Sequence, residues 1–215
     1  MPKIFSIHRL VFFFLFIPIL IPLACNQADS PTVPPSKPPA ATSTPTATPT
    51  VTFTPCGSPV TFGKTTTGSA DSTIYNAIIG DAFTLASTGT LYKLSANFAT
   101  GAGVQAAMGV YTGTLSSPAN LLVQSTAKTC VAGWNDFPVS PTALSAGTYW
   151  ICTFLGPYPG TAGSVFESSG TASDHYGFLE LTGFGGGNGT FPSVASGWTT
   201  STAVSLWDMY ATYCP

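Results

Sequence analysis

The stretch Gly89-Thr-Leu-Tyr-Lys-Leu-Ser-Ala-Asn-Phe98 alternates between two kinds of side chain. One set of alternate positions holds Tyr92, Leu94, Ala96 and Phe98, and the other holds Leu91, Lys93, Ser95 and Asn97. Successive side chains of a β-strand point to opposite faces of a sheet. The pattern therefore predicts a strand with one face against an apolar core and the other face turned to solvent.

Similar segments lie on both sides of this stretch. β-Branched and aromatic residues, bounded by Gly, Pro or Ser, gather in Val104–Tyr111, Asn120–Thr129, Gly147–Leu155 and Ala203–Tyr213. No segment combines a 3.6-residue apolar period with helix caps. About eight to ten strands with frequent turn signals predict an all-β fold, a two-sheet antiparallel β-sandwich of the jelly-roll type.

The charge balance narrows the choice of partners. The chain has six basic and eight acidic residues, and two of the basic ones, Lys3 and Arg9, lie near its start. Residues 56–215 contain no arginine. Nucleic acid is not expected as a partner, because phosphate binding needs clustered cations.

The N-terminal segment reads as an export signal. Lys3 and Arg9 precede the apolar run Val11–Leu23, which would span about 20 Å as a helix, short of the ~30 Å hydrocarbon core. The run ends in Leu23-Ala-Cys25, which resembles the signal of bacterial lipoproteins, although Pro22 departs from that pattern. The resemblance implies that Cys25 is acylated and anchors the protein in the membrane. The alternative is an ordinary signal peptide cut near Ala24.

The next segment has the composition of a stalk. Residues 26–55 contain eight prolines and eight threonines, with Thr-x-Thr-Pro at 42–45, 46–49 and 52–55. Proline fixes φ and removes hydrogen-bond donors, so an extended, disordered linker is expected.

These segments divide the chain into an expected signal peptide (1–24), an acylated cysteine with its linker (25–55) and a β-sandwich domain (56–215). Asn26 after the cysteine favours the outer membrane or the cell surface as the location.

Four motifs in the domain carry a second resemblance. They are Met108-Gly-Val-Tyr111, Ser117-Pro-Ala-Asn-Leu-Leu122, Gly133-Trp-Asn-Asp-Phe-Pro-Val139 and Leu144-Ser-Ala-Gly-Thr-Tyr-Trp-Ile151. Together they look like a jelly-roll module of bacterial extracellular proteins. Such modules accompany hydrolases, adhesins and repeat proteins, so the resemblance implies the fold and an extracellular location rather than a reaction.

Four cysteines in the domain fit two disulfides in an exported protein. Cys56 and Cys214 lie at its two ends, and domain termini are often close together, so we expect a bond between them. We expect a second bond between Cys130 and Cys152. A zinc site is the alternative, but the domain has no CxxC pair and a single histidine.

No catalytic constellation stands out, and we do not expect an enzyme. His175 adjoins Asp174, but no Gly-x-Ser-x-Gly nucleophile motif occurs. Glu167, Asp174 and Glu180 are close in sequence, yet nothing fixes their spacing for glycoside hydrolysis. The glycine run 183–189 lacks the lysine of a phosphate-binding loop.

No cofactor is expected, although a structural calcium ion could use oxygen ligands from three aspartates, Asp71, Asp81 and Asp208. The alternative is that these aspartates are simply solvated. None lies in an EF-hand-like loop.

Sugar binding would require aromatic rings that face solvent. Of the four tryptophans, Trp134, Trp150, Trp198 and Trp207, we expect Trp150 and Trp207 to be buried. Trp198 and Tyr158 lie in loop-like sequence and are the candidate ligand-binding residues.

Taken together, the sequence favours a lipid-anchored surface protein that binds an extracellular ligand, such as a glycan, without catalysis. A structural or adhesive subunit acting through protein contacts is the alternative, and an extracellular hydrolase ranks third.

Overall fold

A computed structural model describes residues 56–74, 77–100, 104–156, 163–180, 190–202 and 205–215. The expected signal peptide, Cys25, the linker, Tyr158 and the glycine run lie outside these residues. Every described element is a β-strand, so the expected all-β class is confirmed. Among the same residues, no helix could cross a membrane.

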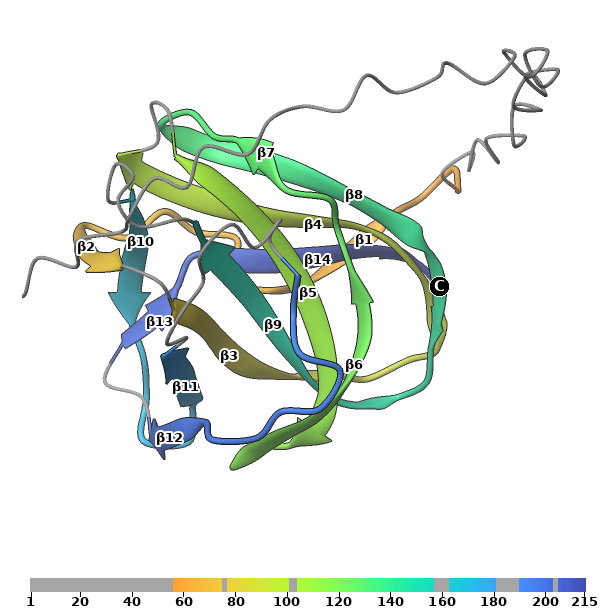
Figure 1. Cartoon of the computed structure of the whole chain (residues 1–215). Coiled ribbons are helices and arrows are strands. Elements are labelled where there is room, and N and C mark those ends of the chain that lie inside the picture. The colour runs from red at the N-terminus through yellow and green to blue at the C-terminus, as the bar shows by residue number, and fades with distance from the viewer. Residues whose placement is uncertain (1–55, 75–76, 101–103, 157–162, 181–189, 203–204) are drawn as a thin grey trace, which may run out of the picture. The chain divides into compact units, whose positions relative to one another are not determined.

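The strands form two antiparallel sheets that pack face to face (Figure 1). Sheet I follows the order β1 (Val60–Gly63), β14 (Met209–Cys214), β4 (Gly89–Thr100), β10 (Gly163–Ser169) and β13 (Ser205–Trp207), while β8 (Gly133–Leu144) pairs with β4 and β2 (Ala70–Ile74) with β10. Sheet II follows the order β12 (Thr199–Thr202), β11 (His175–Glu180), β3 (Ala77–Leu85), β9 (Gly147–Leu155), β5 (Gln105–Thr114) and β6 (Ser117–Gln124), with β7 (Lys128–Thr129) paired to β5.

The connectivity is that of a jelly roll. Strands β1, β14, β4 and β8 of sheet I lie over β3, β9, β5 and β6 of sheet II, and the chain crosses repeatedly from one sheet to the other. The first and last strands, β1 and β14, are neighbours. The expected two-sheet β-sandwich is therefore confirmed.

The main core fills the space between the sheets. On β4, Leu94, Ala96 and Phe98 are fully buried in it, as the alternation predicts. Leu91 also points into the core, although the alternation places it on the outer face. The pairing of β4 shifts register between Leu91 and Lys93, and such a β-bulge changes the face of the residues beyond it.

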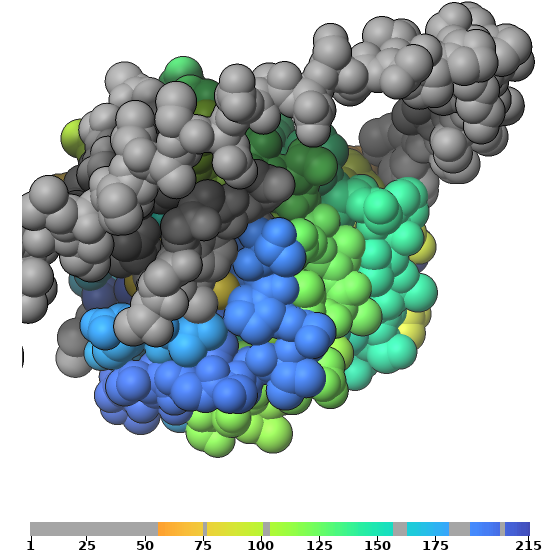
Figure 2. Space-filling model, in the orientation of Figure 1, coloured from red at the N-terminus to blue at the C-terminus, as the bar shows by residue number. Residues whose placement is uncertain are grey.

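A second apolar cluster covers the outer face of sheet II. It includes Tyr111, Trp150 and Phe154, and residues 190–198, here called the strap, lie over it. The strap pairs with the edge of β6, because Leu121 N donates to Ser193 O at 2.9 Å and Ala195 N donates to Ala119 O at 2.7 Å. Figure 2 shows the strap (blue) across β5 and β6 (green).

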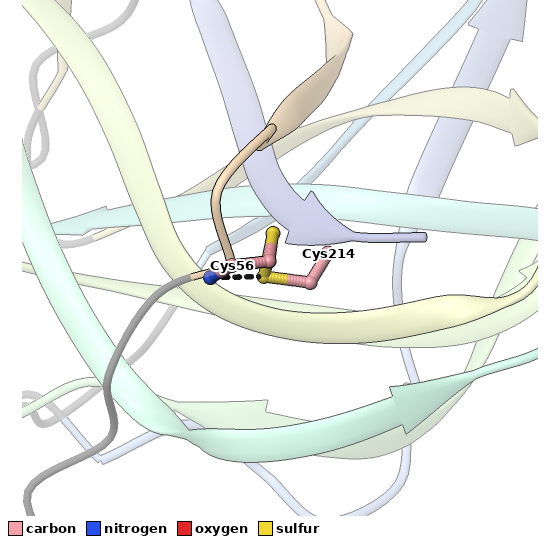
Figure 3. The surroundings of a disulfide bond; sticks show 2 residues. All are labelled: Cys56 and Cys214. Atoms are coloured by element: carbon pink, nitrogen blue, oxygen red, sulfur yellow. Dashed lines mark hydrogen bonds between the residues drawn. A yellow bond between two sulfur atoms is a disulfide. The ribbon is translucent and has the colours of Figure 1, made fainter.

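A disulfide between Cys56 and Cys214 joins the two ends of the domain, as expected, with their Cα atoms 5.7 Å apart. Figure 3 shows Cys56 ahead of β1 and Cys214 at the end of β14. The expected bond between Cys130 and Cys152 is wrong, since both are buried free thiols. Cys130 belongs to the core between the sheets, whereas Cys152 belongs to the cluster on the outer face of sheet II, so the sheet separates their sulfur atoms.

Candidate binding site

Aromatic and charged side chains meet on the outer face of sheet I. Trp134 on β8 lies opposite Asn97 of β4, and Tyr210 on β14 lies opposite Ser95 of the same strand. The two rings reach over β4 from its two sides, and their centroids are 5.0 Å apart with the planes inclined by 55°. Both residues remain partly exposed.

An ion pair adjoins these rings. Asp136 accepts a hydrogen bond from Lys93 Nζ at 3.1 Å on Oδ2 and from Ser95 Oγ at 2.7 Å on Oδ1. The side chains of Lys93 and Asp136 are 29% and 53% exposed. Partial burial opposes ionisation of Asp136, but the hydrogen bonds from Ser95 and Lys93 and the charges of Lys93 and Lys128 outweigh it and lower the pKa of Asp136. The site thus holds an accessible carboxylate beside an accessible ammonium group.

The aromatic rings lie above polar groups that are held in place. Ser95 and Asn97 are buried although they lie on the outer face of the sheet, where Tyr210 and Trp134 are their cross-strand neighbours. Asn97 Nδ2 donates to Thr67 Oγ1 at 3.2 Å. The loop that carries Thr67 is held by Asp208, whose Oδ2 accepts from Gly68 N at 2.6 Å. These contacts fix one border of the site.

Trp198 is partly exposed, but its ring does not stand free in solvent, contrary to what the loop-like sequence predicts. It packs on the outer face of sheet II, with its ring centroid 5.9 Å from that of Tyr111 and 6.1 Å from that of Trp150. Its Nε1 atom is buried. Trp150 is fully buried, as expected, whereas Trp207 is only partly buried. Trp198 ends the strap and packs against the apolar outer face of sheet II, where burial removes apolar surface of its ring from water.

The three aspartates considered for calcium do not converge. Asp71 is exposed on β2, and Asp81 lies buried between the sheets. Both carboxylate oxygens of Asp208 are engaged by the chain, Oδ2 by Gly68 and Oδ1 by Ser168 Oγ at 2.7 Å. Within the described ranges, no group of three or more His, Cys, Asp or Glu side chains is placed to bind a metal ion.

The carboxylates considered for catalysis come from different elements of the fold. Asp174 accepts hydrogen bonds from Thr171 N at 2.7 Å and Thr171 Oγ1 at 2.9 Å, so it closes a turn ahead of β11. Glu180 ends β11 and is exposed, while Glu167 lies on β10 in the other sheet. Glu167 and Asp174 instead contribute their charge to the surroundings of Asp81.

Sequence reasoning placed Trp134 among four competing tryptophans and did not single out Lys93, Asp136 or Tyr210. The spacing Trp134-x-Asp136 could have indicated that these two side chains lie side by side, since residues two apart share a face of a strand.

No model of a known protein family matches the sequence, and no curated protein or solved structure is significantly similar to it.

Proposed function

We propose that the protein is a surface lipoprotein whose β-sandwich binds an extracellular glycan without catalysis. The observation that carries this proposal is the outer face of sheet I, where Trp134 and Tyr210 lie beside the Lys93–Asp136 pair. Aromatic rings supply apolar contact area, and the flanking polar groups can hydrogen-bond to hydroxyls. Sites built on strands hold such groups more rigidly than loops do.

The position of the disulfide suits display from a tether. Cys214 ends β14 and is bonded to Cys56, where the sequence of the linker ends. Tyr210 lies near the start of the same strand, about 13 Å away at 3.3 Å per residue. Because the linker would enter at the Cys56 end of β14, the aromatic rings lie at the opposite end of the strand from the tether.

Glycan binding is tested on an array of extracellular glycans with the compact unit Pro49–Pro215, which contains every described strand. Saturable binding is expected for the wild type, with loss in Trp134→Ala and retention in Trp134→Phe, which keeps an aromatic ring. Leu115→Ala is the surface control, since Leu115 is 42% exposed on the turn after β5. A blank array from a folded, oxidised sample would contradict glycan binding and favour a surface subunit that acts through protein contacts.

Lipid anchoring needs a separate test on the full chain. In a bacterial host, we expect the wild type to incorporate radiolabelled palmitate and to sediment with membranes. Cys25→Ser should abolish both. Unlabelled wild-type protein in the soluble fraction would indicate an ordinary cleaved signal peptide.

A further inference from the structure

We infer that the outer face of sheet I binds an uncharged sugar through two neighbouring hydroxyls, and that it does so without a metal ion. The inference rests on the proposed glycan-binding function and concerns the same site. It follows from the charges of Lys93 and Asp136, from their spacing relative to Trp134, and from the properties of a hydroxyl group.

The charges favour a neutral ligand. Lys93 and Asp136 form an ion pair whose nitrogen and oxygen atoms are 3.1 Å apart, so each neutralises the other. Lys128 is also engaged, because its Nζ donates to Asp136 O at 2.6 Å and lies 4.6 Å from the centroid of the Phe137 ring. A ligand carboxylate or sulfate would have to compete with Asp136 for Lys93 in a chain where acids outnumber bases. Charge complementarity therefore favours an uncharged sugar over an acidic one.

The hydrogen-bonding capacity favours hydroxyls. A carboxylate only accepts hydrogen bonds and an ammonium group only donates them, whereas a hydroxyl does both. Two adjacent hydroxyls can donate to Asp136 and accept from Lys93 without separating the ion pair. Asp136 oxygens have further lone pairs beyond those used by Ser95 and Lys93, and the ammonium of Lys93 has three protons.

The spacing of Trp134 and Asp136 along β8 places the ion pair beside a sugar ring that stacks on the indole. Trp134 and Asp136 are two residues apart on the same face of β8, which corresponds to about 7 Å along the strand. A pyranose ring lying over the indole would therefore bring the hydroxyls of one edge to the ion pair. Calcium takes about six to eight oxygen ligands, whereas Asp136 is the single carboxylate at this contact, so we expect Asp136 and Lys93 to hold the sugar directly.

The test measures binding of the Pro49–Pro215 unit to neutral hexasaccharides of glucose, mannose and galactose, and to oligogalacturonate of the same length. We expect binding to at least one neutral hexasaccharide, unchanged by a calcium chelator. Asp136→Asn and Lys93→Met should each weaken it by about tenfold or more, because hydrogen bonds to charged groups are the stronger ones. Glu180→Gln, which changes an exposed carboxylate on sheet II, should leave it unchanged. The melting temperatures of these variants should stay close to that of the wild type, since an ion pair at the surface contributes little to stability.

The outcomes separate this inference from the function on which it rests. Preferential binding of oligogalacturonate, loss of binding in chelator, or full affinity in Asp136→Asn with loss in Trp134→Ala would overturn the inference and leave glycan binding intact. Absence of binding to every glycan by folded protein would overturn both.

Discussion

Asp81 is the most unusual residue of the core. It is fully buried between the sheets, where its Oδ2 accepts a hydrogen bond from Trp207 N at 2.8 Å and so connects β3 of sheet II to β13 of sheet I. Its Oδ1 is buried without a hydrogen-bond partner. Burial raises the pKa of Asp81 well above its ordinary value, and the charges of Glu167, Asp174 and Asp208 raise it further against the Trp207 hydrogen bond.

The raised pKa of Asp81 predicts that it opposes stability as pH increases. Between the ordinary pKa and the raised one, the folded state holds a proton that the unfolded state has lost, so the free energy of unfolding falls with rising pH. Asp81→Asn removes this term, and its melting temperature should fall less than that of the wild type between pH 4 and 7. Asp136 makes the free energy of unfolding rise with pH in the wild type and in Asp81→Asn alike, because its pKa is lowered in the folded state.

Asp71→Asn is the matched control for this pH dependence, since Asp71 is exposed on β2. Its melting temperatures should follow the wild-type curve. Parallel curves for Asp81→Asn and the wild type would show that Asp81 is ionised to the same extent in the folded and unfolded chains.

The two free thiols should be unreactive in the folded protein. Burial raises the pKa of Cys130 to about 11, against the charge of Lys128, and burial and then the charge of Asp81 raise the pKa of Cys152 well above its ordinary value. The thiolate is the reactive form, so a thiol reagent should label the oxidised Pro49–Pro215 unit slowly when folded and at two sites in denaturant. If neither cysteine were labelled in denaturant, Cys130 and Cys152 would not be free thiols, and this prediction would be wrong.

At the scale of elements, the strap stabilises sheet II by covering its outer apolar face. Phe191 is 3% exposed, and its backbone N donates to Gln124 Oε1 at 2.8 Å. The hydroxyl of Tyr111 donates to Pro192 O at 2.7 Å. Phe191→Ala should lower the free energy of unfolding by about 3 kcal/mol, as measured by urea denaturation.

Val194→Ala provides the comparison for Phe191→Ala within the same segment. Val194 is 56% exposed, so its truncation should change stability by about 0.5 kcal/mol or less. Equal effects of the two substitutions would mean that the strap does not seal the cluster beneath it.

The sequence predicts individual strands well where one face is buried and the other is polar. The expected strand Gly147–Leu155 has the bounds of β9, and the alternation assigns the faces of β4 correctly from Lys93 to Phe98. Leu91 is assigned wrongly because a bulge leaves no mark in the alternation. The expected strand Asn120–Thr129 is divided between β6 and β7.

Contacts between distant segments are what the sequence leaves open. Trp134 and Tyr210 belong to β8 and β14, and they meet only because both strands flank β4. Likewise, the loop-like sequence around Trp198 gives no sign that sheet II has an apolar outer face to receive it. Strand order decides both contacts, and alternation within one strand carries no information about strand order.

For the whole molecule, the Cys56–Cys214 bond should be a major source of stability. It joins residues 158 positions apart, and β1 and β14 pair directly beside it. In the chain-entropy model, closing a loop of this length removes freedom from the unfolded chain worth about 4–5 kcal/mol. Cys56→Ser with Cys214→Ser should lower the free energy of unfolding by up to this amount, as measured by urea denaturation of the Pro49–Pro215 unit.

Because Trp134 and Tyr210 lie away from the Cys214 end of β14, the same double variant should bind glycan with little change in affinity when binding is measured well below its melting temperature. Unchanged stability in the double variant would show that pairing of β1 with β14 alone holds the ends together, and a large loss of affinity would show that the bond also shapes the binding face.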